Sequence, residues 1–560
     1  MKQMDLVYVT YNSSRWIDHC FASIMKSDYD LKKVNVFVVD NASQDDTLEK
    51  LNAVKEQYGQ TVNAFEIISA GKNLGFGRAN NLGFQHGNSE IVCFLNIDTE
   101  LCADTLKQLD ADISQSEDTF SLWELRQFPY EHPKFYDAVT CETSWSSGAA
   151  FAIKRDVYAQ VGGFDDGIFM YAEDVDLSWR LRSFGHRLRY VPKAVIYHYS
   201  YETSGQIKPN QYLNSVINNL LLRYRFGSLR DIIVGHARVL NQFRFPDVFP
   251  GSRKYLFKKY LKHFLNIFHF WNKKSRGNSK NFKPTFLGFD YAPIRDGAFY
   301  ENEFPAENPL VSIIVRTCGR PAVLRETLIS LRHQTYKNLE VVVVEDGEAT
   351  AEEMIRKEFS DLNIQYKASG TKVGRSRAGN MAMELAKGKY LNFLDDDDLF
   401  YADHVEVLVK TIQRQNARVA YAFAFETPVV VHSKDPYHYT VHDYLGIHKQ
   451  MYNKVILCHH NYIPIQCVMF EKSLFEQYGG LDVTLDALED WDLWVRYSQY
   501  TDFVSVGKTT SIYRVPYDRT IDAKRQKELD DALITVREKH KGYSQTVSVY
   551  DVAMLYQNGM

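Results

Sequence analysis

The sequence contains one ordered pattern twice, and this duplication restricts the architecture more than any other feature. Each copy opens with an apolar strand, continues with a second strand and a glycine-containing turn, and reaches a third strand that ends in acid. These expected strands are residues 6–9, 36–39 and 91–95 in the first copy, and 311–315, 341–344 and 390–394 in the second. Late in each copy, a Gly-Gly turn precedes an acidic helix start. We therefore expect two domains with the same fold.

Near-continuous β-branched strands that alternate with helical segments predict the α/β class, with a largely parallel sheet covered on both faces. A chain of 560 residues suits two or three domains. We expect domains at residues 1–230 and 308–530, a helical basic connector at 231–307, and a tail at 531–560. Such sheets bind ligands at the carboxyl ends of their strands. The residues expected there are Thr10, Asp40, Asp98, Thr317, Asp346 and Asp397.

Four consecutive aspartates, Asp395 to Asp398, follow the apolar strand 390–394. Carboxylates this close repel one another unless something positive lies between them. A divalent cation, Mg²⁺ or Mn²⁺, held by oxygen ligands and shared with substrate phosphates, would neutralise them. A solvated acidic loop is the alternative, but the preceding apolar strand argues against it.

The remaining landmarks suggest nucleotide binding. Asp40 and Asp346, expected at the ends of the second strands, could accept hydrogen bonds from a nucleobase. The glycine-containing turns open helices whose backbone N–H groups could bind a diphosphate. Arginines in the same segments would add charge-assisted donors; they are Arg78, Arg375 and Arg377.

Two acidic pairs are candidate general bases, Glu173-Asp174 and Glu489-Asp490, because adjacent carboxylates raise each other's pKa. The alternative is a solvated acidic face near a helix N-terminus, since Asp176 and Asp492 continue each acidic run at helical spacing. His198 ends an apolar segment and has two interpretations, a structural histidine or a third metal ligand.

These ordered motifs resemble those of the family 2 glycosyltransferases, nucleotide-diphospho-sugar enzymes with the GT-A fold, over nearly all of residues 1–230 and 308–530. The resemblance implies tandem GT-A domains and inverting sugar transfer with a divalent metal. The family's Asp-x-Asp motif, which binds ribose and metal, maps onto Asp395 and Asp397. Its base motif maps onto the two Glu-Asp pairs, with Asp174 and Asp490 as the favoured bases.

The first copy departs from that pattern, because Asn96-Ile97-Asp98 carries one carboxylate. This motif resembles the rhamnosyltransferase branch of the family, in which a histidine similar to His198 joins the metal shell. The resemblance implies dTDP-L-rhamnose as the first copy's donor. The second copy's donor is left open by its motifs, and we expect a UDP-hexose or UDP-N-acetylhexosamine. The expected metal ligands are Asp98, His198 and Asp397. The expected nucleotide-sugar-binding residues are Thr10, Asn12, Asp40, Asn73, Arg78, Asn96, Thr317, Arg320, Asp346, Arg375, Arg377, Asp395 and Asp396.

The connector is basic and aromatic, and residues 251–284 contain no Asp or Glu. A basic helix with aromatic residues on one face can lie on an anionic membrane. Alternatively, the aromatic residues pack on the two domains while the lysines face water. No nucleic-acid-binding motif accompanies this segment, so we expect no nucleic-acid partner.

We therefore predict a bifunctional glycosyltransferase that adds two different sugars to a bacterial surface polysaccharide, such as an O antigen or capsule, on an acceptor that a lipid could carry. One alternative keeps a single active domain and makes the other a glycan-binding or scaffolding module. A nucleotidyltransferase is a second, although no glycine-rich triphosphate loop with its lysine is evident. Without an apolar leader, a span of ~20 apolar residues or paired cysteines, we expect a cytoplasmic protein, free or bound to the inner face of the cytoplasmic membrane.

Overall fold

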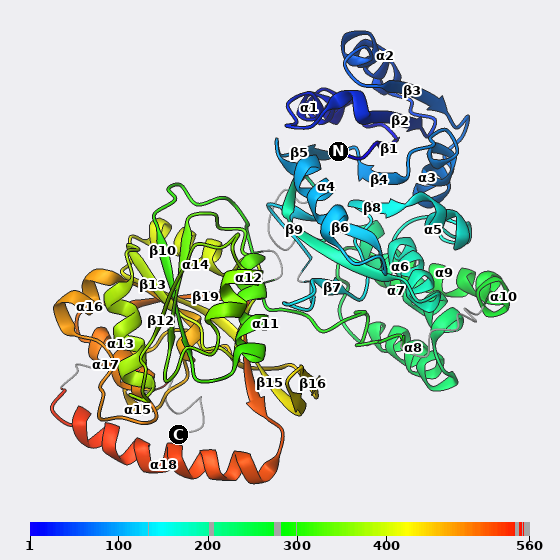
Figure 1. The fold of residues 1–560 in the computed structure, drawn as a ribbon. Helices are drawn as coiled ribbons and strands as arrows, with labels where there is room; N and C mark the ends of the chain where they lie inside the picture. The colour runs from blue at the N-terminus through cyan, green and yellow to red at the C-terminus, as the bar shows by residue number, and fades with distance from the viewer. Residues whose placement is uncertain are drawn as a thin grey trace. The chain divides into compact units, whose positions relative to one another are not determined.

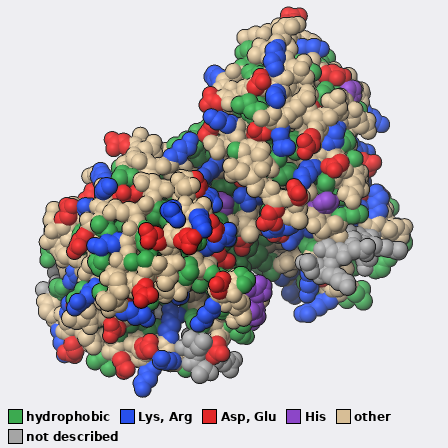
Figure 2. All heavy atoms as spheres, viewed as in Figure 1, with side chains coloured by type: hydrophobic (Ala, Val, Ile, Leu, Met, Phe, Trp, Pro, Cys, Tyr) green, Lys and Arg blue, Asp and Glu red, His purple; other side chains and the backbone are tan. Residues whose placement is uncertain are grey.

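The computed structural model describes residues 1–132, 134–200, 206–273, 282–297, 300–543, 548–550 and 553, without the side chains of 519–522. The chain forms two compact units (Figure 1). Residues 1–294 belong to the first, and residues 295–297 and the chain from 303 onward belong to the second. Charged side chains of both signs are mixed over the visible surface (Figure 2), as a net charge of −4 would suggest.

The first unit is built on a nine-stranded sheet, in which the main strand order is β3-β2-β1-β4-β8-β6-β9-β5 and β7 pairs with β9. Strands β3, β2, β1 and β4 are parallel, whereas β8 is antiparallel to its neighbours β4 and β6. The strands are β1 (Met4–Thr10), β2 (Val34–Asp40), β3 (Ala64–Ser69), β4 (Ile91–Asn96), β5 (Thr99–Leu101), β6 (Phe120–Phe128), β7 (Glu142–Thr143), β8 (Ala150–Lys154) and β9 (Arg187–His198).

Helices cover both faces of this sheet, because side chains alternate along each buried strand. In β1, Tyr8 packs in one hydrophobic cluster with Phe21, while Val7 packs in another with Ala79 and Leu177. The helices are α1 (Ser14–Met25), α2 (Thr47–Tyr58), α3 (Phe76–Phe84), α4 (Thr105–Gln115), α5 (Arg155–Gln160) and α6 (Glu173–Ser183), with a 3₁₀ turn η1 (Leu31–Lys33).

A group of helices follows the sheet and belongs to the first unit. It comprises α7 (Pro209–Phe226), α8 (Leu229–Gln242), α9 (Ser252–His263), η2 (Phe264–Asn266) and α10 (Ile267–Asn272). Helices α8, α9 and α10 each contact α7. Their shared core includes Leu220, Leu256 and Phe270. Part of the expected connector is therefore packed as a helical layer on the first unit.

The second unit repeats the sheet in the order β12-β11-β10-β13-β18-β15-β19-β14, with β16 and β17 pairing with β15. Its strands are β10 (Val311–Thr317), β11 (Leu339–Glu345), β12 (Ile364–Ala368), β13 (Tyr390–Phe393), β14 (Leu399–Phe400), β15 (Val419–Lys434), β16 (Tyr437–Val441), β17 (Leu445–His448), β18 (Val468–Glu471) and β19 (Phe503–Pro516). Strands β10 to β13 are mutually parallel where they pair, and β18 is again antiparallel to β13.

The helices of the second unit follow the same sequence of positions. They are α11 (Pro321–Arg332), α12 (Glu352–Glu358), α13 (Arg375–Leu385), α14 (His404–Gln415), α15 (Lys454–His459), α16 (Lys472–Tyr478), α17 (Glu489–Ser498) and α18 (Arg519–His540), with a 3₁₀ turn η3 (Ile465–Cys467). The segment expected to be a tail from residue 531 begins inside α18. Among the helices whose residues are described, none combines the length and hydropathy of a membrane span.

The α/β class and the duplication are confirmed. The sheets are mixed rather than largely parallel, since each joins a parallel four-stranded part to strands of both directions. The sequence obscured this because the antiparallel strands β8 and β18 are as buried as parallel ones, so hydrophobic pattern alone does not separate the two directions.

Candidate active sites

The strand register shows which residues are equivalent in the two units. Val7 of β1 lies opposite Phe94 of β4, and Ile314 of β10 lies opposite Phe393 of β13. Val7 and Ile314 hold the same place in their strands, each three residues before the final threonine. Asp98 and Asp397 each follow the paired phenylalanine by four residues. These two carboxylates are therefore equivalent, as are Asn96 and Asp395.

The register corrects the expected pairing of Asp40 with Asp346. Asp40 lies opposite Thr10, whereas the residue opposite Thr317 is Glu345. The buried Glu345 carboxylate accepts hydrogen bonds from the loop that follows it and from Tyr366 of β12. Burial raises its pKa, but hydrogen bonds, chiefly from Thr350 and Tyr366, outweigh burial and leave the pKa below its usual value. Two adjacent acids end this strand, and the sequence did not reveal which is the last strand residue.

Asp346 instead matches Asn41, since each N–H bonds to the threonine carbonyl of the neighbouring strand. Both side chains hold a glycine-containing turn. Asp346 accepts the backbone N–H groups of Val373 at 2.6 Å and Gly374 at 3.1 Å, and Asn41 Oδ1 accepts the N–H of Leu74 at 2.7 Å. Some N–H groups expected to face a diphosphate are thus directed at these side chains.

Several other expected nucleotide-binding residues of the first unit lie together at the ends of β1 and β2. Asp40 is buried and accepts a hydrogen bond from Thr10 Oγ1 at 3.2 Å and others from the backbone N–H of Ser43 at 3.3 Å. Asn12 has a φ of 50° and accepts the N–H of Gln44 at 2.8 Å. Thr10, Asn12 and Asp40 therefore form one polar loop cluster.

Asp98 and His198 face each other at the edge of the first sheet. His198 Nε2 lies 3.5 Å from Asp98 Oδ1, and His198 Nδ1 lies 2.8 Å from Oε1 of the buried Gln127. Because an amide oxygen only accepts, His198 Nδ1 donates the hydrogen in this contact, and the other ring nitrogen, Nε2, is turned toward Asp98. Burial raises the pKa of Asp98, but His198 outweighs it and holds the pKa low. A carboxylate and an oriented imidazole are suitable ligands for a divalent cation.

The second unit has a different arrangement around its acidic run. Leu399 pairs with Ile512 where Glu100 pairs with Tyr197, so Tyr513 takes the place of His198. Asp397 is the most exposed of the four aspartates and borders a cavity. Within the described ranges, no three His, Cys, Asp or Glu side chains converge as a preformed metal site. A cation at either site would therefore complete its shell with substrate oxygens or water.

Arg316 joins the acidic strand end of the second unit to its base motif. Its guanidinium forms two 2.7 Å bonds with Asp395, from Nε to Oδ1 and from Nη2 to Oδ2. Nη1 of Arg316 also donates to Glu489 Oε1 at 2.9 Å. Burial raises the pKa of Asp395, but Arg316 outweighs it and lowers the pKa. Both oxygens of Asp395 are thus engaged with an internal cation.

In the first unit, these positions hold Val9, Asn96 and Glu173. The missing carboxylate at Asn96 is therefore matched by a missing arginine at Val9. The two differences compensate in charge. Glu173 has no arginine here, and its Oε2 is buried without a hydrogen-bond partner among the described residues.

Arg320 provides a second cation for the aspartate run, pairing with Asp396 and, at 3.0 Å, with Asp397. Thr317 Oγ1 donates to Asp396 at 2.6 Å. Asp398 accepts the backbone N–H of Arg514 at 2.9 Å. Arginines thus neutralise part of the negative charge of the four aspartates, the charge from which the sequence predicted a bound cation. These ion pairs were not evident from the sequence, because the arginines lie far from the aspartates along the chain.

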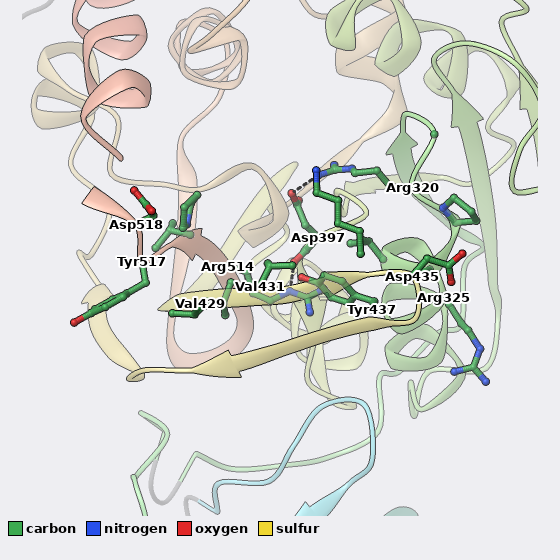
Figure 3. Close-up of a pocket in the computed structure, with 18 of the residues that line it drawn as sticks. Arg320, Arg325, Asp397, Val429, Val431, Asp435, Tyr437, Arg514, Tyr517 and Asp518 are labelled. Atoms are coloured by element: carbon green, nitrogen blue, oxygen red, sulfur yellow. Dashed lines mark hydrogen bonds and ion pairs between the residues drawn. The ribbon is translucent and has the colours of Figure 1, made fainter. Parts of the chain in front are cut away.

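A cavity of about 950 Å³ opens beside Asp397 (Figure 3). The start of α11, the β15–β16 hairpin and the end of β19 form its walls. Arg514 lines it from β19 and lies over the ring of Tyr437, 5.6 Å from the ring centroid. Its Nη1 is 2.6 Å from Glu326, while its buried Nη2 has no hydrogen-bond partner within the described part of the chain. No pattern in the sequence predicted this pocket, because its walls come from segments that are far apart along the chain.

The acidic pairs begin helices in both units, Glu173 at α6 and Glu489 at α17. The preceding residues, Ala172 and Leu488, have φ of 67° and 58°. Left-handed backbone in non-glycine residues is strained and is concentrated at functional sites. Both units thus carry the same strained backbone conformation at the residue just before the Glu-Asp pair.

The proposed bases are half-buried and are held by different groups. Asp174 Oδ2 accepts the N–H of Gly148 at 2.8 Å, and Asp490 Oδ2 accepts Nδ2 of Asn461 at 3.1 Å. Burial, followed by repulsion from Glu489, raises the pKa of Asp490 to about 7. Burial likewise raises the pKa of Asp174. Carboxylates with raised pKa values are suited to general base catalysis near neutral pH.

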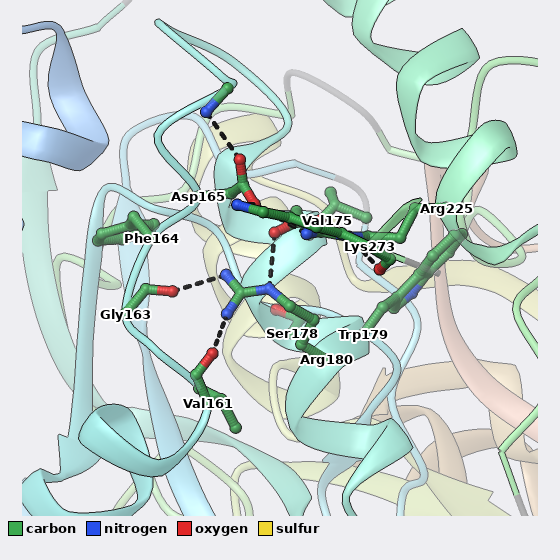
Figure 4. A network of polar contacts seen from close by, with 12 residues as sticks. Val161, Gly163, Phe164, Asp165, Val175, Ser178, Trp179, Arg180, Arg225 and Lys273 are labelled. Atoms are coloured by element: carbon green, nitrogen blue, oxygen red, sulfur yellow. Dashed lines mark hydrogen bonds and ion pairs between the residues drawn. The ribbon is translucent and has the colours of Figure 1, made fainter. Parts of the chain in front are cut away.

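The next acid of each helix anchors it through an ionic network (Figure 4). In the first unit, Asp176 pairs with Arg180 at 2.8 Å, and Arg180 donates to the carbonyl of Gly163 at 2.6 Å. Arg225 of α7 pairs with Asp176 and, at 2.8 Å, with Asp165. The solvated-face alternative is wrong here, because Asp176 is fully buried.

The second unit builds the same network with other cations. Asp492, also fully buried, pairs with Arg496 at 2.8 Å, and Lys539 and His540 of α18 approach it at 2.8 Å and 3.0 Å. Lys539 also pairs with Asp482 at 2.6 Å. The segment expected as a tail therefore helps to fix the base helix.

The remaining predicted residues lie around the glycine-containing turns. Asn73 Oδ1 accepts the N–H of Gly75 at 3.0 Å. Arg78 Nε donates to the carbonyl of Asp166 at 3.0 Å. Arg375 and Arg377 are exposed at the start of α13. These arginines are close to the turns, but Arg78 is directed at a protein carbonyl.

Arg316→Val should destabilise the second unit by about 3–5 kcal/mol, because it leaves the buried Glu489 and its neighbour Asp395 without their cation. The double variant Arg316→Val/Asp395→Asn, which reproduces the first unit's residues, should recover part of this loss. Calorimetry measures both. Arg325→Val, which breaks an exposed ion pair between α11 and α12, should cost less than about 1 kcal/mol. Equal losses for Arg316 and Arg325 would show that the buried cluster contributes nothing special.

Comparison with known proteins identifies the family. The Glycosyl transferase family 2 profile matches residues 5–176 and 312–479. The chain is 29% identical over 198 residues to the uncharacterized glycosyltransferase RP339 of Rickettsia prowazekii, covering 34% of this chain and 59% of that protein. It is 33% identical over 175 residues to the glycosyltransferase GlyA of Streptococcus pneumoniae, covering 30% and 25%. The chain thus spans under two thirds of these relatives.

Solved structures include a mannosyltransferase, PcManGT from Pyrobaculum calidifontis, in complex with GDP-Man and Mn²⁺ (19% identity, 49% of this chain and 74% of that chain, TM-score 0.33). Another is TarS residues 1–349 from S. aureus (20% identity, 50% and 76%, TM-score 0.32). At these scores, the fold assignment rests on the strand topology and the family match. The chain, with its duplicated sheet and both halves matched, belongs to the Glycosyl transferase family 2 and consists of tandem GT-A domains.

Proposed function

We propose that each unit is an inverting glycosyltransferase and that the chain adds two different sugars to one growing glycan. The observation that carries the proposal is the contact of Arg316 with both Asp395 and Glu489. One side chain links the acidic strand end to the base motif. The two motifs, ~94 residues apart in sequence, therefore belong to one site, and the equivalent elements recur in the first unit.

The chain's residues would divide the work as follows. Asp98 and His198 in the first unit, and Asp397 in the second, would hold a divalent cation, Mg²⁺ or Mn²⁺. When bound, it would stabilise the charge on the departing nucleoside diphosphate. Asp174 and Asp490 would accept the proton of the attacking acceptor hydroxyl.

The single carboxylate of the first unit does not argue for an inactive domain. Asp395, the acid that the first unit lacks, is occupied by Arg316, so Asn96 replaces an ion-paired carboxylate and not a free ligand. This supports two active sites over the alternative of one enzyme and one scaffold. The alternative with one enzyme and one scaffold predicts that only one of the two sites hydrolyses a donor.

The donors belong to the same proposal. We infer dTDP-L-rhamnose for the first unit and a UDP-hexose or UDP-N-acetylhexosamine for the second, from the motif resemblance. The product would be a bacterial surface polysaccharide of the O-antigen or capsule type. Incubation of the whole chain with single donors and acceptors, read by mass shift, identifies each sugar.

Asp98→Ala should abolish one transfer and Asp397→Ala the other, each by more than about 100-fold, since a catalytic cation contributes several kcal/mol. Each variant should leave the other transfer intact. Product masses with separate donors measure this. Asp18→Ala, at an exposed position of the first unit, is the control. If Asp397→Ala preserved both transfers, the assignment of the second site would be wrong.

The transfer by the second unit should fall about tenfold per pH unit below about pH 7 and level off above it. The carboxyl of Asp490, with a pKa of about 7, loses its ability to accept a proton when it is protonated. Asn461→Ala removes a hydrogen bond to the charged form and should move the midpoint upward, by up to about one unit. The pH profile of kcat/KM measures both, and a midpoint unmoved by Asn461→Ala would contradict this role.

A further inference from the structure

Helices α9 and α10 and the turn η2 between them expose a row of large apolar side chains. Their exposed fractions are 51% for Phe257, 53% for Leu261, 45% for Phe264, 79% for Leu265 and 74% for Phe268. At 3.6 residues per turn, these positions fall on about one third of the helix circumference. We call them the apolar row.

The opposite side of the same helices is buried. Leu256 and Phe270 are almost inaccessible and pack with Leu220 of α7. The packing against the first unit is therefore complete without the apolar row. The interpretation that aromatic side chains of this segment pack on a domain therefore accounts for Phe270 but not for the apolar row, which faces outward.

The charged side chains carried by α9, η2 and α10 themselves are all positive. Lys254, Lys258 and Lys262 are exposed at four-residue spacing, along one edge of the row. The sequence from Val248 to Lys273 contains no Asp or Glu.

We propose that the apolar row and its lysines dock the chain on an anionic lipid bilayer, with α9 and α10 lying in the plane of the headgroups. An interfacial helix combines an exposed apolar face with flanking lysines that meet anionic headgroups. The charge complementarity favours this occupant over a second copy of the chain, whose apolar row would bring the same lysines together. The docking does not depend on which sugars the active sites transfer.

Flotation of the full-length chain with vesicles tests the docking. Vesicles of phosphatidylcholine with about one third phosphatidylglycerol should carry the chain at low salt, and pure phosphatidylcholine should carry much less. Leu265→Glu/Phe268→Glu should abolish flotation, because it places charges in the apolar row. Lys254→Glu/Lys258→Glu/Lys262→Glu should weaken partitioning by at least about 100-fold, given the contribution of each lysine near an anionic surface.

Matched controls place the same changes on the second unit. Phe304→Glu/Ile534→Glu replaces exposed apolar side chains, and Lys357→Glu/Lys524→Glu/Lys527→Glu replaces exposed lysines. Both should float like the unaltered chain, and circular dichroism should show all variants folded. The proposal would be overturned if flotation were the same with anionic and pure phosphatidylcholine vesicles. It would also be overturned if Leu265→Glu/Phe268→Glu floated like the unaltered chain. A dimer in sedimentation velocity that Leu265→Glu/Phe268→Glu dissolves would overturn it as well, since a second copy would then cover the row.

Discussion

Negative charge gathered at the carboxyl ends of the strands is the constraint on which both candidate sites depend. Buried carboxylates are costly unless they are paired, protonated or bound to a cation. The second unit satisfies most of this requirement internally, with Arg316 on Asp395 and Arg320 on Asp396. Asp397 is left as the exposed acid of the run, so a substrate-linked cation would meet one accessible carboxylate rather than four competing ones.

The two units show how the residues of such a charge cluster can differ while positive and negative charges still offset each other. Removal of Asp395 alone would leave Arg316 with one partner, and removal of Arg316 alone would leave two acids without a cation. The first unit has neither group, with Val9 and Asn96 in their places. It retains Asp98 and adds His198, oriented by Gln127. The number of carboxylates in the motif therefore does not give the number of metal ligands, because one carboxylate, Asp395, is paired with an arginine.

The sequence was a good guide to what is local and repeated. The strands, the order of the motifs and the helix starts at Glu173 and Glu489 could be predicted because each has its own pattern of apolar and acidic residues. The match of Asp40 to Asp346 was wrong by one residue, because strand ends depend on pairing partners. The partners of the aspartates could not be predicted at all. Arg316 is ~79 residues from Asp395, and Arg225 is ~49 residues from Asp176, so only the folded chain brings their charges together.

Helices α6 and α17, which begin with the Glu-Asp pairs, depend on neutralised carboxylates in the same way. The buried third acid of each helix pairs with an arginine of its own helix and takes a further cation from a helix outside the sheet: Arg225 of α7 in the first unit, and Lys539 with His540 of α18 in the second. The acids Asp176 and Asp492 are equivalent, and in each unit the helix that supplies the further cation follows the equivalent strand, β9 or β19. The requirement for a neutralised buried carboxylate is thus the shared element, and the residues that meet it differ. The segments after the two sheets can therefore differ, as a helical layer in one unit and the long helix α18 in the other, while a Glu-Asp pair begins α6 in the first unit and α17 in the second.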